Sequence, residues 1–285
     1  MRWTPGGPSS DLEDQRGSSG GRGLGIGGVP IGIGGFVVLL LLSLVFHRNF
    51  FALLGGGGAP APAGQTAPVN SSPEENKEVQ FVSFVLDDVQ KTWEQIFAQE
   101  GQQYRHAKLV LFRDAVRSGC GTAETAMGPF YCPADEKVYI DLGFYKELKD
   151  RFGASGDFAE AYVIAHELGH HVQNLLGISG KVERAQRQNA EEANALSVRL
   201  ELQADCLAGV WGHSTQQRNI LEAGDVDEAL NAASAVGDDR IQKQATGRVN
   251  QETWTHGSAQ QRSQWFKTGF DSGSINNCDT FSAGR

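Results

Sequence analysis

The sequence predicts an α+β fold that is predominantly helical with a small sheet and is preceded by one transmembrane helix. Downstream of residue 78, long stretches repeat apolar residues at helical spacing, and only two short runs are typical of strands. Near the start, residues 24–46 include no charged side chain and are long enough to span a bilayer. The formal net charge of −9 and the lack of a long basic run argue against a nucleic-acid partner.

The domain organisation follows from composition. Arg2, Arg16 and Arg22 precede the apolar stretch and Arg48 follows it, which favours a cytoplasmic start and a downstream domain outside the cytoplasm. A cleaved signal peptide is the alternative, because Ala59-Pro-Ala61 offers small residues for cleavage, but the charged lead and the apolar run are both long for one. We expect a glycine-rich cytoplasmic segment (1–28), an uncleaved single-pass transmembrane helix (29–54), a Gly/Ala/Pro-rich linker (55–78) and one domain (79–285).

The elements of this domain can be placed in order. Apolar periodicity predicts a helix over Glu78–Gln99, and β-branched and aromatic runs predict two strands. Two later helices begin near the capping-box spacings of Asp225 with Glu228 and of Ser258 with Gln261. The strands are expected at Leu109–Phe112 and Val138–Leu142. Two further helices are expected, at Gly156–Leu176 and at about Gln186–Gln217. The first of them has Ser155 as its N-cap and ends at Gly177.

The first of these two helices carries the sequence His166-Glu167-Leu168-Gly169-His170. A four-residue step on a helix advances slightly more than one turn, so both imidazoles leave the same face and can bind one metal ion. This is the HExxH signature of zinc hydrolases. Two histidines and a glutamate are costly on a buried helix unless they are paired or bound to metal, which disfavours a purely structural pair. His171 lies on another face and is expected to be a packed or hydrogen-bonded neighbour.

A catalytic zinc site usually takes three protein ligands. Glu201 and Asp205 lie four residues apart on the second helix, beside apolar residues that half-bury their face. We expect Glu201 to be the third zinc ligand and Asp205 to accept a hydrogen bond from a zinc histidine. The alternative is that both are solvated acids, since the same helix also carries Glu191 and Glu192.

Several segments together resemble a known family. The HExxH motif coupled to Glu201 and Asp205 is similar to the gluzincins, which are thermolysin-like zinc peptidases. More closely, the chain resembles the YpfJ-like family of bacterial, membrane-anchored neutral zinc metallopeptidases, and the similarity spans essentially the whole length. The residues that carry it are Gly121, Gly128–Pro133, Val138–Leu142, His166–Gln173, Glu201–Cys206, His256–Ser258 and the start, Met1–Trp3 with Asp14–Gly17.

The resemblance implies a zincin-like domain that binds Zn²⁺ and hydrolyses peptide bonds of protein or peptide substrates. Glu167 would then be the general base that takes a proton from water. The strand at Val138–Leu142 is the expected edge strand on which an extended peptide would bind. Two alternatives remain open: a non-peptide amidase or deformylase-type hydrolase, and a metal-stabilised envelope module that binds proteins without turnover. No feature of the sequence specifies an oligomeric state.

Hydrolysis of this type needs a donor aimed at the oxyanion that develops on the attacked carbonyl. His256 is the best candidate, because it stands in the loop Trp254–Gly257, where a side chain can point into a cleft. Its alternative role is to cap or pack the final helix.

The four cysteines fit an exported domain. An even count predicts two disulfides, Cys120 with Cys132 and Cys206 with Cys278, although four cysteines allow three pairings. A cysteine as metal ligand is the alternative, but the chain has no CxxC pair and Glu201 is available.

Overall fold

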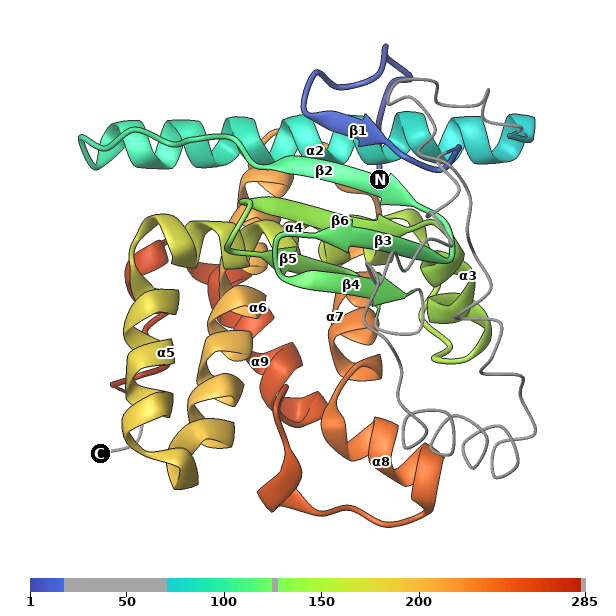
Figure 1. Cartoon of the computed structure of the whole chain (residues 1–285). Coiled ribbons are helices and arrows are strands. Elements are labelled where there is room, and N and C mark those ends of the chain that lie inside the picture. Colours follow the sequence, from blue (N-terminus) through green and yellow to red (C-terminus); the bar gives the residue numbers. More distant parts are fainter. Residues whose placement is uncertain (18–70, 125–127, 283–285) are drawn as a thin grey trace, which may run out of the picture. The chain divides into compact units, whose positions relative to one another are not determined.

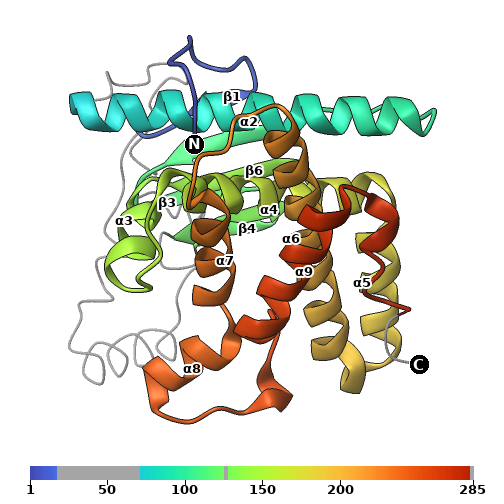
Figure 2. The same cartoon turned by 180° about the vertical axis from the view of Figure 1, so that it is seen from behind.

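The computed structural model describes residues 1–17, 71–124 and 128–282. The chain divides into two compact units, one of Met1–Gln15 with Asn70–Arg285 and one of Arg16–Val69. The described elements, shown in Figures 1 and 2, all belong to the first unit. They are β1 (Leu12–Asp14), α2 (Pro73–Gln99), β2 (Lys108–Phe112), β3 (Ala115–Ser118), β4 (Gly121–Glu124), β5 (Phe130–Cys132), β6 (Lys137–Asp141), α3 (Gly143–Asp150), α4 (Asp157–Leu175), α5 (Ile178–Gln188), α6 (Ala193–Gln217), α7 (Asp225–Ala235), α8 (Asp238–Thr246) and α9 (Ala259–Ser272), with short 3-10 turns between some of them.

A four-stranded sheet has the order β1-β2-β6-β5, in which β1, β2 and β6 are parallel and β5 is antiparallel to β6. Side chains alternate between its two faces. Leu109, Leu111, Val138 and Ile140 pack into the main core with α2 and α4. The opposite face, with Val110, Phe112 and Tyr139, packs against the β3–β4 hairpin. The mainly helical α+β prediction is therefore confirmed.

The position of the sheet edge differs from the prediction. The strand expected at Val138–Leu142 is β6, which lies between β2 and β5 and is hydrogen-bonded on both sides. The two edge strands are instead β1 and β5, each of three residues and too short for its alternation to be read from sequence. The prediction that Val138–Leu142 forms the edge was therefore wrong.

The helices that follow the sheet pack around α4. Contacts join α4 to α6 and α7, and α6 packs most extensively against α9 (Figure 2). Two glycines allow α6 and α9 to approach closely. A Cβ at Gly269 would stand 1.9 Å from the carbonyl oxygen of Cys206, and one at Gly209 would stand 2.0 Å from that of Phe266. Any other residue at either position would push these helices apart.

The N-terminal ends of α4 and α7 differ from their predicted caps, whereas α9 has the predicted one. The Gln261 side chain and the Ser258 cap form the expected capping box of α9. By contrast, α4 begins after Gly156 without a cap from Ser155, and its Phe158 amide donates to the Glu228 carboxylate of α7. Glu228 therefore caps α4 from a neighbouring helix and takes no part in a capping box with Asp225.

Both predicted disulfides are present. Cys120 bonds to Cys132 and ties the β3–β4 turn to the edge strand β5. Cys206 bonds to Cys278 and ties α6 to the C-terminal end of the chain. With all four cysteines in disulfides, the alternative of a cysteine metal ligand was wrong.

The predicted transmembrane helix (29–54) and most of the linker (55–78) lie outside the described residues. Within residues 1–17, 71–124 and 128–282, no helix is long and apolar enough to cross a membrane. At the start of the chain, Met1–Gln15 belongs to the same compact unit as Asn70–Arg285.

Candidate metal centre

Helix α4 positions the two histidines of the HExxH motif. The rings of His166 and His170 leave the same face of α4, with centroids 4.8 Å apart and planes at 90°. Glu167, between them in sequence, is buried, and its desolvation raises the pKa of its carboxyl group. A carboxyl group whose pKa is raised in this way is suited to accept and return a proton.

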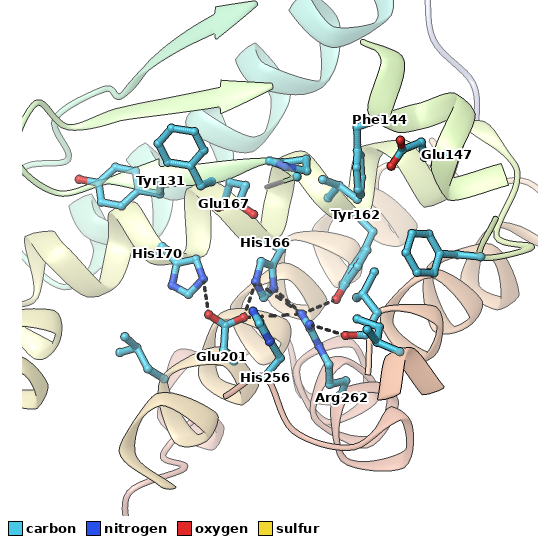
Figure 3. Close-up of a pocket in the computed structure, with 18 of the residues that line it drawn as sticks. Tyr131, Phe144, Glu147, Tyr162, His166, Glu167, His170, Glu201, His256 and Arg262 are labelled. Atoms are coloured by element: carbon cyan, nitrogen blue, oxygen red, sulfur yellow. Dashed lines mark hydrogen bonds and ion pairs between the residues drawn. The ribbon is translucent and has the colours of Figure 1, made fainter. Parts of the chain in front are cut away.

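Helix α6 brings Glu201 to these rings (Figure 3). Glu201 Oε2 lies 3.2 Å from His166 Nε2, and Oε1 lies 3.3 Å from His170 Nε2. One ligand atom from each of the three residues can be chosen so that all lie within 4.8 Å of one another, as a metal ion requires. Burial alone would raise the pKa of Glu201, but the two imidazoles hold it well below its usual range, so the carboxylate stays anionic.

Each histidine has a second partner that fixes its ring. His166 Nδ1 donates to Asp205 at 2.8 Å, and His170 Nδ1 donates to the side-chain oxygen of Gln173 at 2.8 Å. Gln173 is fully buried, and its amide nitrogen donates to the carbonyl oxygen of Leu200 on α6. These bonds leave the Nε2 atoms facing Glu201, the tautomer that a metal ligand needs.

An arginine from α9 completes the network. Arg262 is buried, and its Nε and Nη2 atoms donate to the two oxygens of Asp205, each at 2.9 Å. Tyr162 also donates to Asp205 and lies 3.2 Å from Arg262 Nη2. Burial favours the protonated form of Asp205, but Arg262 and His166 lower its pKa, so a charged carboxylate faces the histidine.

His256 lies on the wall of the same cleft (Figure 3). Its side chain is 50% exposed, and its Nδ1 lies 3.1 Å from Asp238 Oδ1. The second oxygen of Asp238 accepts from the His256 and Gly257 amides, so this carboxylate holds the whole loop. The hydrogen bond to Asp238 raises the pKa of the imidazole. The cap of α9 is Ser258, so His256 does not serve as that cap.

His171 lies apart from the metal centre, as expected. It is fully buried, donates from Nε2 to the carbonyl oxygen of Arg105 at 2.6 Å and lies 3.0 Å from the Tyr131 hydroxyl. Burial lowers the pKa of this imidazole, which keeps it neutral. Its role is to fix Tyr131, whose strand β5 borders the cleft.

The cleft has a volume of about 640 Å³. One wall is β5 with the residues on either side of it, and the candidate metal ligands His166, His170 and Glu201 form the floor. Its other side chains come from α3, α4, α5, α6, α8 and α9 and the loops beside them, and about half of them are apolar. They include Phe144, Phe152, Val163, Val236 and Ile241.

Comparisons with known proteins agree with this geometry. A family model described as "Putative neutral zinc metallopeptidase" matches residues 1–281. The chain belongs to this family. It is 52% identical over 287 residues to "Uncharacterized protein YpfJ" of Escherichia coli strain K12, covering 99% of each chain. It is 51% identical over 191 residues to "Uncharacterized protein Mb2605" of Mycobacterium bovis, covering 63% of this chain and 64% of the relative. No solved structure matches.

Membership of the family supports a zinc peptidase in general terms, and the predicted resemblance is confirmed. Five residues predicted from the sequence lie together in the structure, and His256 at the cleft wall is a sixth. The five are His166, Glu167, His170, Glu201 and Asp205. The sequence did not identify Arg262, Gln173 or Asp238. The i, i+3 spacing of His170 and Gln173 on one helix was a signal that could have found Gln173. For Arg262 and Asp238 the sequence offers no such local signal.

Proposed function

We propose that this protein is a zinc-dependent peptidase in which His166, His170 and Glu201 hold the metal ion. The single observation that carries the proposal is the convergence of these three donors on the floor of a cleft large enough for a peptide. Two imidazoles and a carboxylate are the ligand set of several catalytic zinc sites, and the bonds from Asp205 and Gln173 are the support such ligands need. When bound, zinc would act as a Lewis acid towards the scissile carbonyl and the attacking water.

Glu167 is the general base of the proposed reaction. Its carboxylate takes a proton from the attacking water and delivers it to the leaving nitrogen of the cleaved amide. The raised pKa that follows from its burial supports both transfers, because a carboxylate of ordinary pKa would hold the proton too weakly to pass it on.

His256 is the proposed donor to the oxyanion. Its imidazole lines the cleft, and Asp238 both orients the ring through Nδ1 and favours its protonated form. The remaining ring nitrogen is then a donor that can face the attacked carbonyl oxygen.

The peptide substrate binds along β5 in this proposal. This strand borders the cleft. It pairs with β6 on one side, and on its other side it pairs with no strand among the described residues. An extended peptide can pair with such an edge through main-chain hydrogen bonds. The domain acts outside the cytoplasm, where its two disulfides are stable.

The test compares the purified wild-type protein with its Glu167→Gln variant. The substitution keeps the shape of the side chain and all three metal ligands. We expect the variant to retain zinc and to lose hydrolysis of a casein-type or peptide substrate by at least ~10²–10⁴-fold, the usual contribution of a positioned base. Chelation should abolish wild-type activity, and added zinc should restore it. Zinc-loaded wild-type protein that cleaves no peptide, or a Glu167→Gln variant with normal turnover, would contradict the proposal.

A further inference from the structure

The beginning of the chain forms part of the sheet that carries the catalytic cleft. Strand β1 pairs with β2 in parallel register, with Leu12 opposite Leu109 and Asp14 opposite Leu111. The Leu109 amide donates to the carbonyl oxygen of Asp11, and the Gln15 amide donates to that of Leu111, both at 2.8 Å. β1 therefore completes the edge of the sheet opposite β5.

Charged side chains hold this strand in place. Asp11 is buried and accepts from Lys108 at 2.7 Å, from Gln90 at 2.9 Å and from His106 at 2.6 Å. Glu13 reaches past β2 to Lys137 of β6, with both of its oxygens at 2.8 Å. Removal of the strand would leave the Gln90 side chain, which is fully buried, without one of its partners.

The residues before β1 contact three helices of the same unit. Met1 is buried, and its ammonium group lies 2.6 Å from Asp157, the first residue of α4, and 3.2 Å from Asp225, the first residue of α7. The Trp3 ring stacks edge-on against Phe81 of α2, with centroids 5.3 Å apart. These contacts attach the start of the chain to the helix that bears the HExxH motif.

We infer that Met1–Gln15 lies on the same side of the membrane as the catalytic domain. Backbone hydrogen bonds and buried ion pairs need direct contact, and a hydrocarbon layer about 30 Å thick cannot separate the two partners. Pairing of β1 with β2 of a second copy would give the same placement, because that copy's domain lies on the same side as well. A single crossing, as predicted from the sequence, would separate Met1–Gln15 from the domain and does not fit these contacts.

The experiment compares two added cysteines in the full chain in cells. Ser10→Cys places a thiol at an exposed position before β1, and Glu100→Cys places one at an exposed position after α2. The four native cysteines are in disulfides and do not compete for the label. A charged, membrane-impermeant maleimide is added to cells whose outer barrier has been permeabilised, and again after lysis.

For each thiol, the labelling before lysis is divided by the labelling after lysis. We expect this ratio to be the same for Ser10→Cys and Glu100→Cys. A ratio near the maximum for Glu100→Cys and near zero for Ser10→Cys would overturn the inference. A second measurement does not depend on accessibility. Ser9 donates to Asp87 of α2, so the two thiols of the double variant Ser9→Cys/Asp87→Cys should form a disulfide cross-link in cells, whereas either single variant should keep a free thiol that a maleimide labels after denaturation. Failure of the cross-link in protein that retains both native disulfides would also contradict the inference.

Discussion

At the scale of single residues, the metal centre depends on carboxylates that differ in what they contact. Glu201 faces the Nε2 atoms of both histidines, whereas Asp205 faces only Nδ1 of His166 and is held by Arg262. One carboxylate is therefore placed to bind the metal ion, and the other to orient a ligand. Their substitutions should have effects of different size.

We expect Glu201→Ala to lose zinc outright and Asp205→Asn to weaken zinc binding by ~10–100-fold, as changes to a hydrogen-bond partner of a ligand do. Competition with a chelator of known affinity measures both. Glu191→Gln, an exposed acid just before α6, is the control and should bind zinc normally. Equal, full zinc occupancy in the Glu201 and Asp205 variants would place the third ligand elsewhere.

His256→Ala separates catalysis from metal binding. His256 is not one of the three proposed ligands and its Nδ1 pairs with Asp238, so the variant should fold and keep zinc. We expect kcat to fall by ~10²–10³-fold with KM nearly unchanged, the effect of losing one donor to the oxyanion. Steady-state kinetics on a peptide substrate measure this. A loss of less than about threefold, well below that expected for such a donor, would assign His256 a structural role.

At the scale of elements, the site is built where α4, α6 and α9 meet. The contact between α6 and α9 is close because Gly209 and Gly269 lie in it, and this closeness lets Arg262 of α9 reach Asp205 of α6. A change in the spacing of these helices should therefore affect stability and the metal centre together.

Gly269→Ala tests this spacing. The added methyl group would meet the Cys206 carbonyl oxygen, so we expect the free energy of unfolding to fall by about 1–3 kcal/mol, the usual cost of overpacking. Gly180→Ala on α5 is the matched control, because its methyl group would meet only the Arg184 side chain at 3.5 Å. The control should raise the free energy of unfolding by up to about 1 kcal/mol through helix propensity. Denaturant titration distinguishes the two, and equal stability of both variants would contradict the argument.

The elements also show what sequence reasoning can reach. The histidine pair could be predicted because His166 and His170 are four residues apart on one helix. Glu201 could be predicted as a ligand because a zinc site needs a third one. Arg262 lies on α9, and only the packing of α9 against α6 brings it to Asp205. Strand β1 has three residues, too few for a periodic pattern, and its partner lies almost a hundred positions away. Contacts between such distant segments are fixed by tertiary packing and leave no local signal.

At the scale of the whole described unit, acidic groups gather where α4 and α7 begin. Burial, together with Glu78, Asp157 and Glu228, raises the pKa of Glu160 to about 8, from an ordinary value of 4.5. Between these two pH values the folded protein keeps this proton and the unfolded chain releases it. The contribution of Glu160 therefore lowers the free energy of unfolding as the pH rises from about 4.5 to about 8.

Glu160→Gln should remove this dependence. We expect the variant to be more stable than the wild type at pH 8 by at least about 1.4 kcal/mol, the value of one pKa unit, and close to it at pH 5. Urea unfolding at the two pH values measures the difference. Glu191→Gln, which replaces an exposed acid, is the control and should leave the pH dependence unchanged. A constant offset between wild type and Glu160→Gln at both pH values would show that Glu160 is ionised throughout.

The bond between Cys206 and Cys278 has a consequence for biosynthesis. Cys206 follows Asp205 directly, and its partner is among the last residues of the chain, while Gln203 of the same helix donates to the carbonyl oxygen of Cys278. Arg262, the counter-charge of Asp205, is also synthesised late. A nascent chain that has passed only Glu201 already carries all three proposed metal ligands but none of these supports. The supports of the candidate metal centre are therefore complete only after Cys278 has been synthesised.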